Sequence, residues 1–291
     1  MLLVALVMIP GWGWGGRLQA QEITFAAYNV ANFSPLAEAG QAKPGKSGKA
    51  TQALIRVIRE INPDILGVCE MGSPAQFAHF RELLSQAGLA YPEYEYLEAA
   101  DPQRHLALVS RYPIVARHSQ GEIAFDADGN HEKVRRGILD VTVRLADGVE
   151  LRLLGVHLKS KLPTREGEEL LRRHEGDQVR RHLEAIGRDG PPGPLLLYGD
   201  FNDTRDQPVL RQIAGVRGSA GALTPLPLED AHGDRWTHYW KVNDVYSRID
   251  FLFVNKAAAA LVVREKSYLY RSPFWSEASD HRPLVARLRV R

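Results

Sequence analysis

Two acidic side chains and one amide follow an apolar segment near residue 200. Residues 195–198 are apolar throughout, which is typical of a short strand buried on both faces, and Gly199 ends the run. Asp200, Asn202 and Asp203 come directly afterwards. Oxygen atoms at the tip of a rigid strand can bind a cation or accept a proton, although the same residue types also close ordinary turns. The segment therefore indicates either a reactive centre or an Asx-rich turn.

Similar polar residues stand near the ends of several other apolar segments. The complete set is Asn29, Glu70, His157, Asp200, Asn202, Asp250, Asp280 and His281. A single histidine is commonly a satisfied core residue and a single carboxylate is usually a surface group, but the strands of one sandwich present their ends at shared rims. Carboxylate and amide oxygens suit a hard cation, Mg²⁺ or Mn²⁺. The two histidines also leave Zn²⁺ open, although no closely spaced histidine cluster supports it.

Apolar runs and turn residues predict the elements that position these side chains. Strand-like segments cover residues 23–30, 65–69, 106–110, 137–143, 149–156, 195–198, 248–254 and 284–290. Helices are indicated at 50–61, 74–87 and 166–188, and the charges of the last predict mainly a solvated, salt-bridged face. Asp147-Gly148 is a two-residue hairpin signal, so antiparallel neighbours are expected in the middle of the chain.

Residues 217–247 contain many prolines and glycines and an aromatic group near their end. That group consists of Trp236, His238, Tyr239, Trp240 and Tyr246. The segment is either a long binding loop or a packed cover over a sheet edge. Rings of this kind can stack on a base or a sugar, but packing is the favoured interpretation.

Seven short motifs, in this order along the chain, carry a family resemblance. They are Tyr-Asn-Val (28–30), Pro-Asp-Ile-Leu-Gly-Val-Cys-Glu (63–70), Ser-Arg-Tyr-Pro-Ile (110–114), Val-His-Leu (156–158), Gly-Asp-Phe-Asn-Asp (199–203), Arg-Ile-Asp (248–250) and Ser-Asp-His (279–281). From about residue 22 to the end, the chain resembles the endonuclease/exonuclease/phosphatase superfamily of metal-dependent phosphoesterases. The resemblance implies a four-layered α/β/β/α sandwich of two mixed, largely antiparallel sheets, with the site at one rim.

The resemblance also implies a metal end of the site. Glu70 corresponds to the principal metal ligand, Asn29 stands beside it, and Asp280 contributes to the same end. The implied cofactor is Mg²⁺, with Mn²⁺ as the alternative.

The catalytic roles are implied in the same way. Asp200 corresponds to the group that orients or deprotonates the attacking water, and Asn202 to the group that holds the phosphate. Asp250 corresponds to the carboxylate that fixes the ring of His281, and His281 and His157 flank the scissile phosphate. The general base stays open between Asp200 and the Asp250–His281 pair.

Three further positions concern the phosphate. In deoxyribonuclease-like members an acid pairs with the residue that is His157 here, but the aligned position is Gln103, so His157 is expected to act mainly as a phosphate donor. Arg136 falls where some members place a phosphate-contacting arginine. Lys159 follows the histidine strand and suits an anionic substrate.

Composition sets limits on the remaining possibilities. The 291 residues are 44% hydrophobic and 25% charged with a formal net charge of +2, so the chain can bury a large core and no polyanion-binding tail is implied. Cys69 is the only cysteine, which excludes an intramolecular disulfide and predicts a core filler. We expect a monomer without a stable protein partner.

The first twenty residues differ from the rest. An apolar run at 1–10 is followed by glycines and then by small residues before Gln21, which is typical of a secretory signal and too short for a spanning helix. The usual positive n-region is missing, which indicates a start codon placed too late. We predict a signal peptide at 1–20, a single catalytic domain at 21–291, no transmembrane anchor, and export to the periplasm or the medium.

The sequence thus predicts an exported, divalent-metal-dependent phosphoester hydrolase. A phosphodiesterase or nuclease acting on DNA or RNA is favoured, and the alternative within the class is a phosphatase or phospholipase C-type enzyme acting on inositol phosphates or sphingomyelin. A non-catalytic secreted binding protein of the same fold is a second alternative. A third is a nucleotide-binding P-loop, because residues 40–47 match G-x-x-x-x-G-K-S, although the loop residues after Pro35 separate that motif from its strand.

Overall fold

Two six-stranded β-sheets form the centre of the protein. A computed structural model describes residues 20–37, 45–127, 129–188 and 190–290. The predicted signal peptide lies outside these ranges except for its last residue. None of the helices in the described ranges is long and apolar enough to span a membrane.

The first sheet has one parallel pair of strands. Its strands are β1 (Gln21–Phe33), β2 (Ile65–Met71), β3 (Glu93–Leu97), β4 (His105–Ser110), β15 (Tyr268–Leu269) and β16 (Leu284–Val290). Their order across the sheet is β15-β16-β1-β2-β4-β3. β1 and β2 are parallel and the other neighbours are antiparallel. Parallel strands end at the same edge of a sheet, so the residues that follow the two strands lie close together.

The second sheet repeats this arrangement. Its strands are β5 (Ile114–Arg117), β8 (Leu139–Ala146), β9 (Val149–His157), β10 (Leu195–Asp200), β11 (Thr224–Pro225) and β14 (Asp250–Val254), in the order β11-β14-β10-β9-β8-β5. β9 and β10 are the parallel pair. The remaining neighbours are antiparallel, including β8 and β9, which the Asp147-Gly148 turn joins as predicted.

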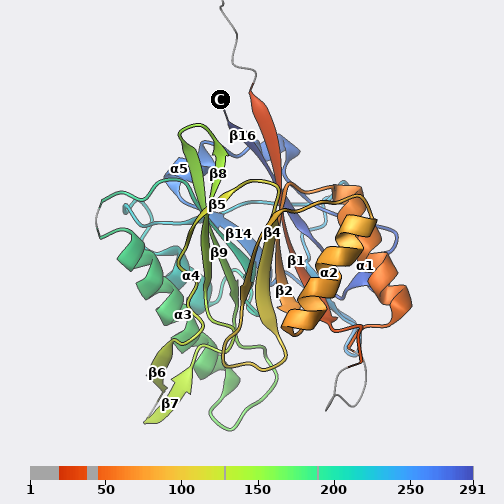
Figure 1. Cartoon of the computed structure of the whole chain (residues 1–291). Helices are drawn as coiled ribbons and strands as arrows, with labels where there is room; N and C mark the ends of the chain where they lie inside the picture. The colour runs from red at the N-terminus through yellow and green to blue at the C-terminus, as the bar shows by residue number, and fades with distance from the viewer. Residues whose placement is uncertain (1–19, 38–44, 128, 189, 291) are drawn as a thin grey trace, which may run out of the picture.

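Helices cover the outer face of each sheet. The longer helices are α1 (Gly48–Ile61), α2 (Pro74–Gln86), α3 (Glu168–Ile186) and α4 (Pro208–Ala214), and the short ones are α5 (Lys256–Ala259), α6 (Trp275–Ala278) and the 3-10 helix η1 (Arg264–Lys266). Figure 1 shows α1 and α2 on one outer side, α3 and α4 on the other, and the sheets between them. The hairpins β6 (Ala124–Ala127)/β7 (Asn130–Lys133) and β12 (His238–Trp240)/β13 (Val245–Ser247) lie apart from the two sheets.

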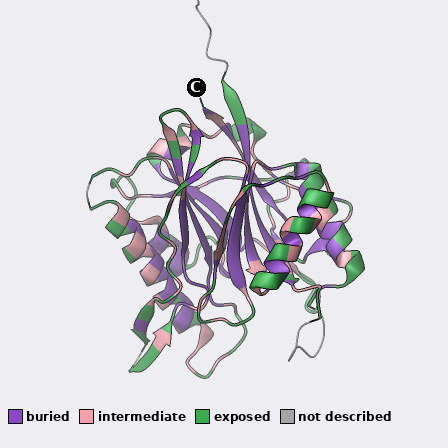
Figure 2. Cartoon of the chain, in the orientation of Figure 1, coloured by how far each residue is buried: buried purple, intermediate pink, exposed green. Residues whose placement is uncertain are grey.

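Three apolar cores hold the four layers together. The inter-sheet core contains side chains of both sheets, such as Phe25 and Leu153, and the other two lie between each sheet and its helices. Figure 2 shows that the central strands are buried along most of their length. Complete burial of a leucine or phenylalanine contributes about 1.5–3 kcal/mol, so these cores supply most of the driving force for folding. The predicted α/β/β/α sandwich is therefore confirmed.

Tyr198 is a fully buried residue of the inter-sheet core, two residues before Asp200. Its ring packs edge-on against Phe25, with centroids 5.2 Å apart. A side chain at Gly67 or at Gly155 would overlap the ring, so these glycines leave the space that it fills. The tight packing holds the end of β10 at a defined distance from the first sheet.

The first two helices begin and end where local chemistry favours it. Ser47 accepts a hydrogen bond from the N–H of Ala50 at the start of α1, and Asn62 ends that helix in the left-handed conformation. Ser73 caps α2, and Pro74 occupies its first turn. Both helices match the predicted positions closely.

The charged helix α3 differs from the prediction in part. Arg172 and Glu175 are buried instead of solvated. The guanidinium of Arg172 donates to the Asp203 carboxylate, and Glu175 accepts the backbone N–H groups of Arg135 and Lys159. These contacts fasten α3 to the loops that follow β9 and β10, a tertiary role that charge spacing within one helix does not reveal.

Candidate active site

Strand alternation brings four polar side chains to one end of the inter-sheet core. Residues two apart on a strand share a face, and Ala27, Tyr198 and Leu252 all point into this core. Two positions further along these strands stand Asn29 on β1 and Asp200 on β10, and Asp250 stands two positions before Leu252 on β14. His157 lies on the face of β9 that also points into this core. Within the second sheet Asp200 is paired with His157 on one side and Asp250 on the other. The Asn29 amide donates to Asp200 Oδ2 at 3.1 Å and so links the two sheets.

Glu70 joins this group through an irregularity in β2. Regular alternation would turn Glu70 away, because Cys69 already faces the inter-sheet core. The register shifts between Cys69 and Met71, and Glu70 has a φ of +64°. Such a bulge re-aims a side chain. Glu70 Oε2 accepts the N–H of Asn32 at 2.9 Å, and Oε1 lies 3.8 Å from His157 Nε2.

The segment before β16 adds His281. The hydroxyl of Ser279 donates to the carbonyl of Asn29 at 2.8 Å and accepts the N–H of His281 at 3.0 Å. His281 Nδ1 lies 2.8 Å from Asp250 Oδ2. The backbone therefore places the imidazole, and Asp250 fixes its ring, because a carboxylate on one ring nitrogen sets the tautomer.

A tight turn after β10 holds Asn202 against the same group. Asn202 has a φ of +51°, and its N–H donates to Asp200 Oδ1 at 2.8 Å. Its side-chain amide donates to the carbonyl of Leu158 at 2.9 Å, which ties the turn to the end of β9. A non-glycine residue in this conformation is strained, and such strain is concentrated at functional sites.

The two buried histidines have opposite electrostatic environments. Burial alone would lower the pKa of His281, but the Asp250 carboxylate raises it to about 10. Burial, followed by the charges of Arg136 and His281, lowers the pKa of His157 well below its ordinary value. At neutral pH His281 therefore carries a positive charge and His157 does not. Environments that separate the pKa values of neighbouring groups are typical of acid–base sites.

Asp200 lies at the centre of the charge distribution. Burial, with the adjacent Asp250 charge as the second cause, raises the pKa of Asp200. Asp200 Oδ2 lies 3.6 Å from His157 Nε2 and 3.8 Å from His281 Nε2. A carboxylate between two imidazoles is well placed to accept a proton.

Arg136 and Lys159, the two predicted phosphate contacts, differ in how far the protein itself already engages their N–H donors. Arg136 is buried and pairs with Asp101 at 2.9 Å, but its Nε and Nη1 have no hydrogen-bond partner in the described part of the chain. Buried donors of this kind normally have a partner, so these two indicate an anion nearby. The ammonium of Lys159 instead donates to the carbonyls of Ser160 and Leu162, at 2.9 and 2.8 Å.

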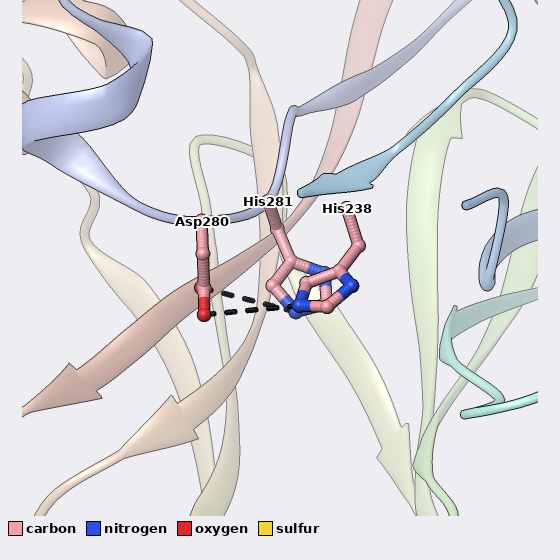
Figure 3. A group of neighbouring side chains, drawn as sticks. All are labelled: His238, Asp280 and His281. Atoms are coloured by element: carbon pink, nitrogen blue, oxygen red, sulfur yellow. Dashed lines mark ion pairs between the residues drawn. The ribbon is translucent and has the colours of Figure 1, made fainter. Parts of the chain in front are cut away.

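Sequence reasoning assigned no site role to Arg104. It considered Lys46 only within the G-x-x-x-x-G-K-S match and His238 only among the aromatic residues of 217–247. Arg104 Nε lies 3.9 Å from Glu70 Oε1. Lys46 is buried, its ammonium donates to the carbonyl of Ala278 at 2.7 Å, and burial lowers its pKa to about 8. The ring of His238 lies against that of His281, with centroids 4.6 Å apart (Figure 3). All three positions depend on contacts between distant segments, which no local pattern in the sequence indicates.

The donor set fits a divalent cation. Glu70, Asp200 and Asp280 offer carboxylate oxygens, and Asn29 offers an amide oxygen, which is the ligand chemistry of Mg²⁺ and Mn²⁺. Asp200 and Asp250 are both buried and directly paired across β10 and β14. The positive charge of His281 compensates part of this buried negative charge, and a bound cation would compensate more of it.

Comparison with known families agrees with this geometry. The model described as the Endonuclease/Exonuclease/phosphatase family matches residues 26–281. The chain belongs to this family. The family resemblance seen in the sequence is confirmed. The predicted enzyme class is confirmed as well, because members of this family are metal-dependent phosphoester hydrolases. Among curated proteins, no sequence matches the chain closely enough to indicate a relative.

Solved structures share the fold of this family member at low sequence identity. Truncated TDP2 from Caenorhabditis elegans is 17% identical, with a TM-score of 0.62 over 92% of this chain and 98% of that one. The human Nocturnin catalytic domain with bound sulfate is 22% identical, with a TM-score of 0.62 over 91% and 93%. Sphingomyelinase C from Streptomyces griseocarneus is 14% identical, with a TM-score of 0.62 over 92% and 99%. At these identities the likeness concerns the fold.

The eight catalytic and metal-binding residues lie together at one end of the inter-sheet core, and their individual roles stay predictions. Residues 40–44 of the G-x-x-x-x-G-K-S match lie outside the described residues, whereas Ser47 caps α1. Cys69 is a buried core residue as predicted, and burial raises the pKa of its thiol.

Proposed function

We propose that this family member is an exported, magnesium-dependent phosphodiesterase that acts on nucleic acid. The observation that carries the proposal is the meeting of Asp200 with Asn29, His157 and His281 within 3.1, 3.6 and 3.8 Å. Hydrolysis of a phosphodiester requires an oriented water, donors for the developing charge and a stabilised leaving oxygen. Export is inferred from the apolar leader at 1–20.

Each residue then has one task. Asp200 accepts the proton of the attacking water, because it is buried between two imidazoles and its pKa is raised. The protonated His281, held by Asp250, donates to a non-bridging oxygen of the phosphate, and His157 and Asn202 contact the same group. Glu70, Asn29 and Asp280 hold the cation, which supplies Lewis-acid stabilisation of the phosphate charge.

The basic residues around the site support an anionic substrate. Two buried donor nitrogens of Arg136 have no partner among the residues that the structure describes, and Arg104 stands beside Glu70. Guanidinium groups match the geometry of phosphate oxygens, so both residues suit the phosphate next to the one that is cut. The sulfate bound to the Nocturnin domain is a comparable anion on the same fold.

A second candidate is a phospholipase C-type activity on lipid phosphodiesters. The hairpin β12/β13 exposes Trp240 and Val242, whose exposed fractions are 50% and 87%, together with Tyr246. Exposed apolar and aromatic side chains of this kind suit a membrane interface. The fold shared with a sphingomyelinase C agrees with this candidate.

A substrate panel tests both candidates. Purified protein is assayed with Mg²⁺ against bis-nitrophenyl phosphate, plasmid DNA, RNA, sphingomyelin vesicles and inositol phosphates, with Asp200→Asn as the inactive control. We expect hydrolysis of the model diester and of nucleic acid. Cleavage of sphingomyelin alone would favour the second candidate, and cleavage of monoesters alone, or no cleavage with any divalent metal, would contradict the phosphodiesterase proposal.

A further inference from the structure

His238 and His281 form a cross-strand pair at the mouth of the site. The two residues are bridged antiparallel, and the N–H of Tyr239 donates to the carbonyl of Asp280 at 2.9 Å. The N–H of Arg282 donates to the carbonyl of Thr237 at 2.7 Å. Side chains directly opposite one another on antiparallel strands lie close together, so the backbone fixes the two imidazoles side by side.

The carboxylate of Asp280 lies beside this pair, so that three potential ligand atoms come together. His238 Nε2 lies 3.9 Å from Asp280 Oδ2, and His281 Nε2 lies 3.9 Å from Asp280 Oδ1 (Figure 3). One ligand atom from each of the three residues lies within 4.8 Å of the others. Ligands around a tetrahedral zinc ion stand about 3.3 Å apart, so a small inward movement of Asp280 brings its two contacts with the imidazoles to that spacing. Asp280 has room for it, because its side chain is 54% exposed.

We propose that His238, Asp280 and His281 form a separate site for a zinc-class ion at the mouth of the active site. Two imidazoles and one carboxylate with an open position facing solvent are a donor set that favours zinc over magnesium. This donor set differs from the oxygen-rich end at Glu70 and Asn29. The two sites share only Asp280.

The surroundings of His281 complete such a site. A metal-binding histidine normally donates its other ring N–H to a carboxylate, and His281 Nδ1 lies 2.8 Å from Asp250 Oδ2. His238 Nδ1 has a longer contact, 3.4 Å, to the Ser247 hydroxyl. The side-chain charges facing His281 are the carboxylates of Asp200, Asp250 and Asp280, which favour a cation at this position.

Zinc at this site and contact of His281 with the phosphate exclude one another. Asp250 holds Nδ1 of the ring, so Nε2, which faces Asp200, is the nitrogen left for either the ion or the phosphate. An ion bound to Nε2 therefore blocks the contact with a phosphate oxygen. Zinc is therefore expected to inhibit magnesium-supported hydrolysis, a consequence that rests on the proposed function, whereas the metal site itself does not.

Cobalt binding to the full chain provides the test. Co²⁺ replaces zinc and is followed by its visible absorption, at a fixed concentration of Mg²⁺ that occupies the oxygen-rich end. We expect wild-type protein to give the spectrum of low-coordinate cobalt with nitrogen ligands and His238→Ala to bind at least about tenfold more weakly. His232→Ala, which removes an exposed histidine from the same segment, serves as the matched control and is expected to bind like wild type.

Each outcome decides a different claim. Equal cobalt affinity of His238→Ala and wild type, or no cobalt spectrum in wild type, would overturn the metal site. Asp280→Asn provides a second variant in case His238→Ala is misfolded, and it must weaken cobalt binding as well. Hydrolysis by wild-type protein with Mg²⁺ alone leaves the proposed function intact whatever cobalt does, and cobalt binding without hydrolysis leaves only the metal site.

Discussion

At the scale of single residues, the site depends on the carboxylates of Asp200 and Asp250, whose two buried negative charges would be unfavourable without partners. Asp200 and Asp250 face each other across β10 and β14, and both are buried. Each carboxylate has its own partner. Asp250 is paired with His281, and Asp200 accepts a hydrogen bond from the side-chain amide of Asn29. Buried charges persist only when they are paired, so the carboxylates and His281 must be considered as one unit.

The tie between Asp250 and His281 leads to the first prediction. Asp250→Asn removes the largest of the carboxylate charges that raise the pKa of His281, so in metal-free protein that pKa should fall clearly below its wild-type value of about 10, although Asp200 and Asp280 still raise it. NMR titration of the His281 ring measures this directly. Activity at neutral pH should fall by about 10²–10⁴, because the His281 ring loses the carboxylate that fixes it and its positive charge is less favoured.

Asp244→Asn is the control for that measurement. Asp244 is exposed and accepts a hydrogen bond from the Tyr239 hydroxyl on the hairpin, whereas the charges that raise the pKa of His281 are those of Asp250, Asp200 and Asp280. Its replacement should leave the His281 titration unchanged. An unaltered pKa of His281 in Asp250→Asn would show that Asp250 does not govern the charge of the ring.

The sequence identified many residues of the site and missed others for a physical reason. Asp200 and Asn202 stand in short motifs at strand ends, where the chemistry is visible locally. Arg104 and His238 join the site through contacts between segments that are far apart in the chain, Arg104 with Glu70 and His238 with His281. A lone arginine or a histidine within an aromatic stretch carries no local sign of such a contact.

At the scale of elements, two parallel strand pairs bring the reactive side chains together. β1 with β2 and β9 with β10 each end at one edge. Alternation turns Asn29, His157 and Asp200 into the inter-sheet core near these ends, whereas the bulge in β2 turns Glu70. The bulge at Glu70 was not predicted, because its cause is the register of three neighbouring strands. The apolar runs did predict β2 and β10 themselves, since both are buried on both faces.

Gly199 provides the second prediction. Its φ is +141°, and a side chain there would overlap the carbonyl of Val156 on β9. Gly199→Ala should lower the free energy of unfolding by at least about 2 kcal/mol and displace Asp200. Denaturant unfolding and hydrolysis assays measure the two effects.

Gly193 is the matched glycine for this comparison. It lies in the loop before the same strand, with open space where a side chain would stand. Gly193→Ala should leave both stability and activity near the wild-type values. Equal behaviour of the two variants would contradict the tight contact between β9 and β10.

The third prediction concerns a buried ionic network beneath α3. Asp140 accepts two hydrogen bonds from Arg152, at 2.8 and 2.6 Å, and its Oδ2 lies 2.7 Å from His182 Nε2. Burial raises the pKa of Asp140, but the partners outweigh burial and hold the pKa below its ordinary value. Asp140→Asn should cost about 3–5 kcal/mol of unfolding free energy, because it leaves Arg152 uncompensated.

The pH dependence of this network has a definite sign. A lowered pKa in the folded state gives stability that is present above the ordinary value of 3.8 and is lost as the pH falls through the folded-state pKa. The stability difference between wild type and Asp140→Asn should therefore shrink below about pH 4, as followed by denaturant unfolding. Asp147→Asn, in the exposed hairpin turn, should show neither effect.

At the scale of the whole molecule, each sheet supplies part of one site. Asn29 and Glu70 come from the first sheet, and His157, Asp200 and Asp250 from the second. Packing around Tyr198 sets the distance between the sheets, so the geometry of the site depends on the inter-sheet core. The family resemblance in the sequence predicted this arrangement, whereas hydrophobic periodicity alone predicted only the separate strands.

A double-mutant cycle across the two sheets tests this account most directly. The measurement is kcat/KM for magnesium-supported phosphodiester hydrolysis by wild type, Glu70→Gln, Asp200→Asn and the double variant. If both residues serve one site, each single change lowers kcat/KM by about 10³ or more. The kcat/KM of the double variant should then be scarcely lower than that of the less active single variant. A double variant whose loss in kcat/KM equals the product of the two single losses would contradict a shared metal-dependent site. A single variant whose kcat/KM is within tenfold of wild type would contradict it as well.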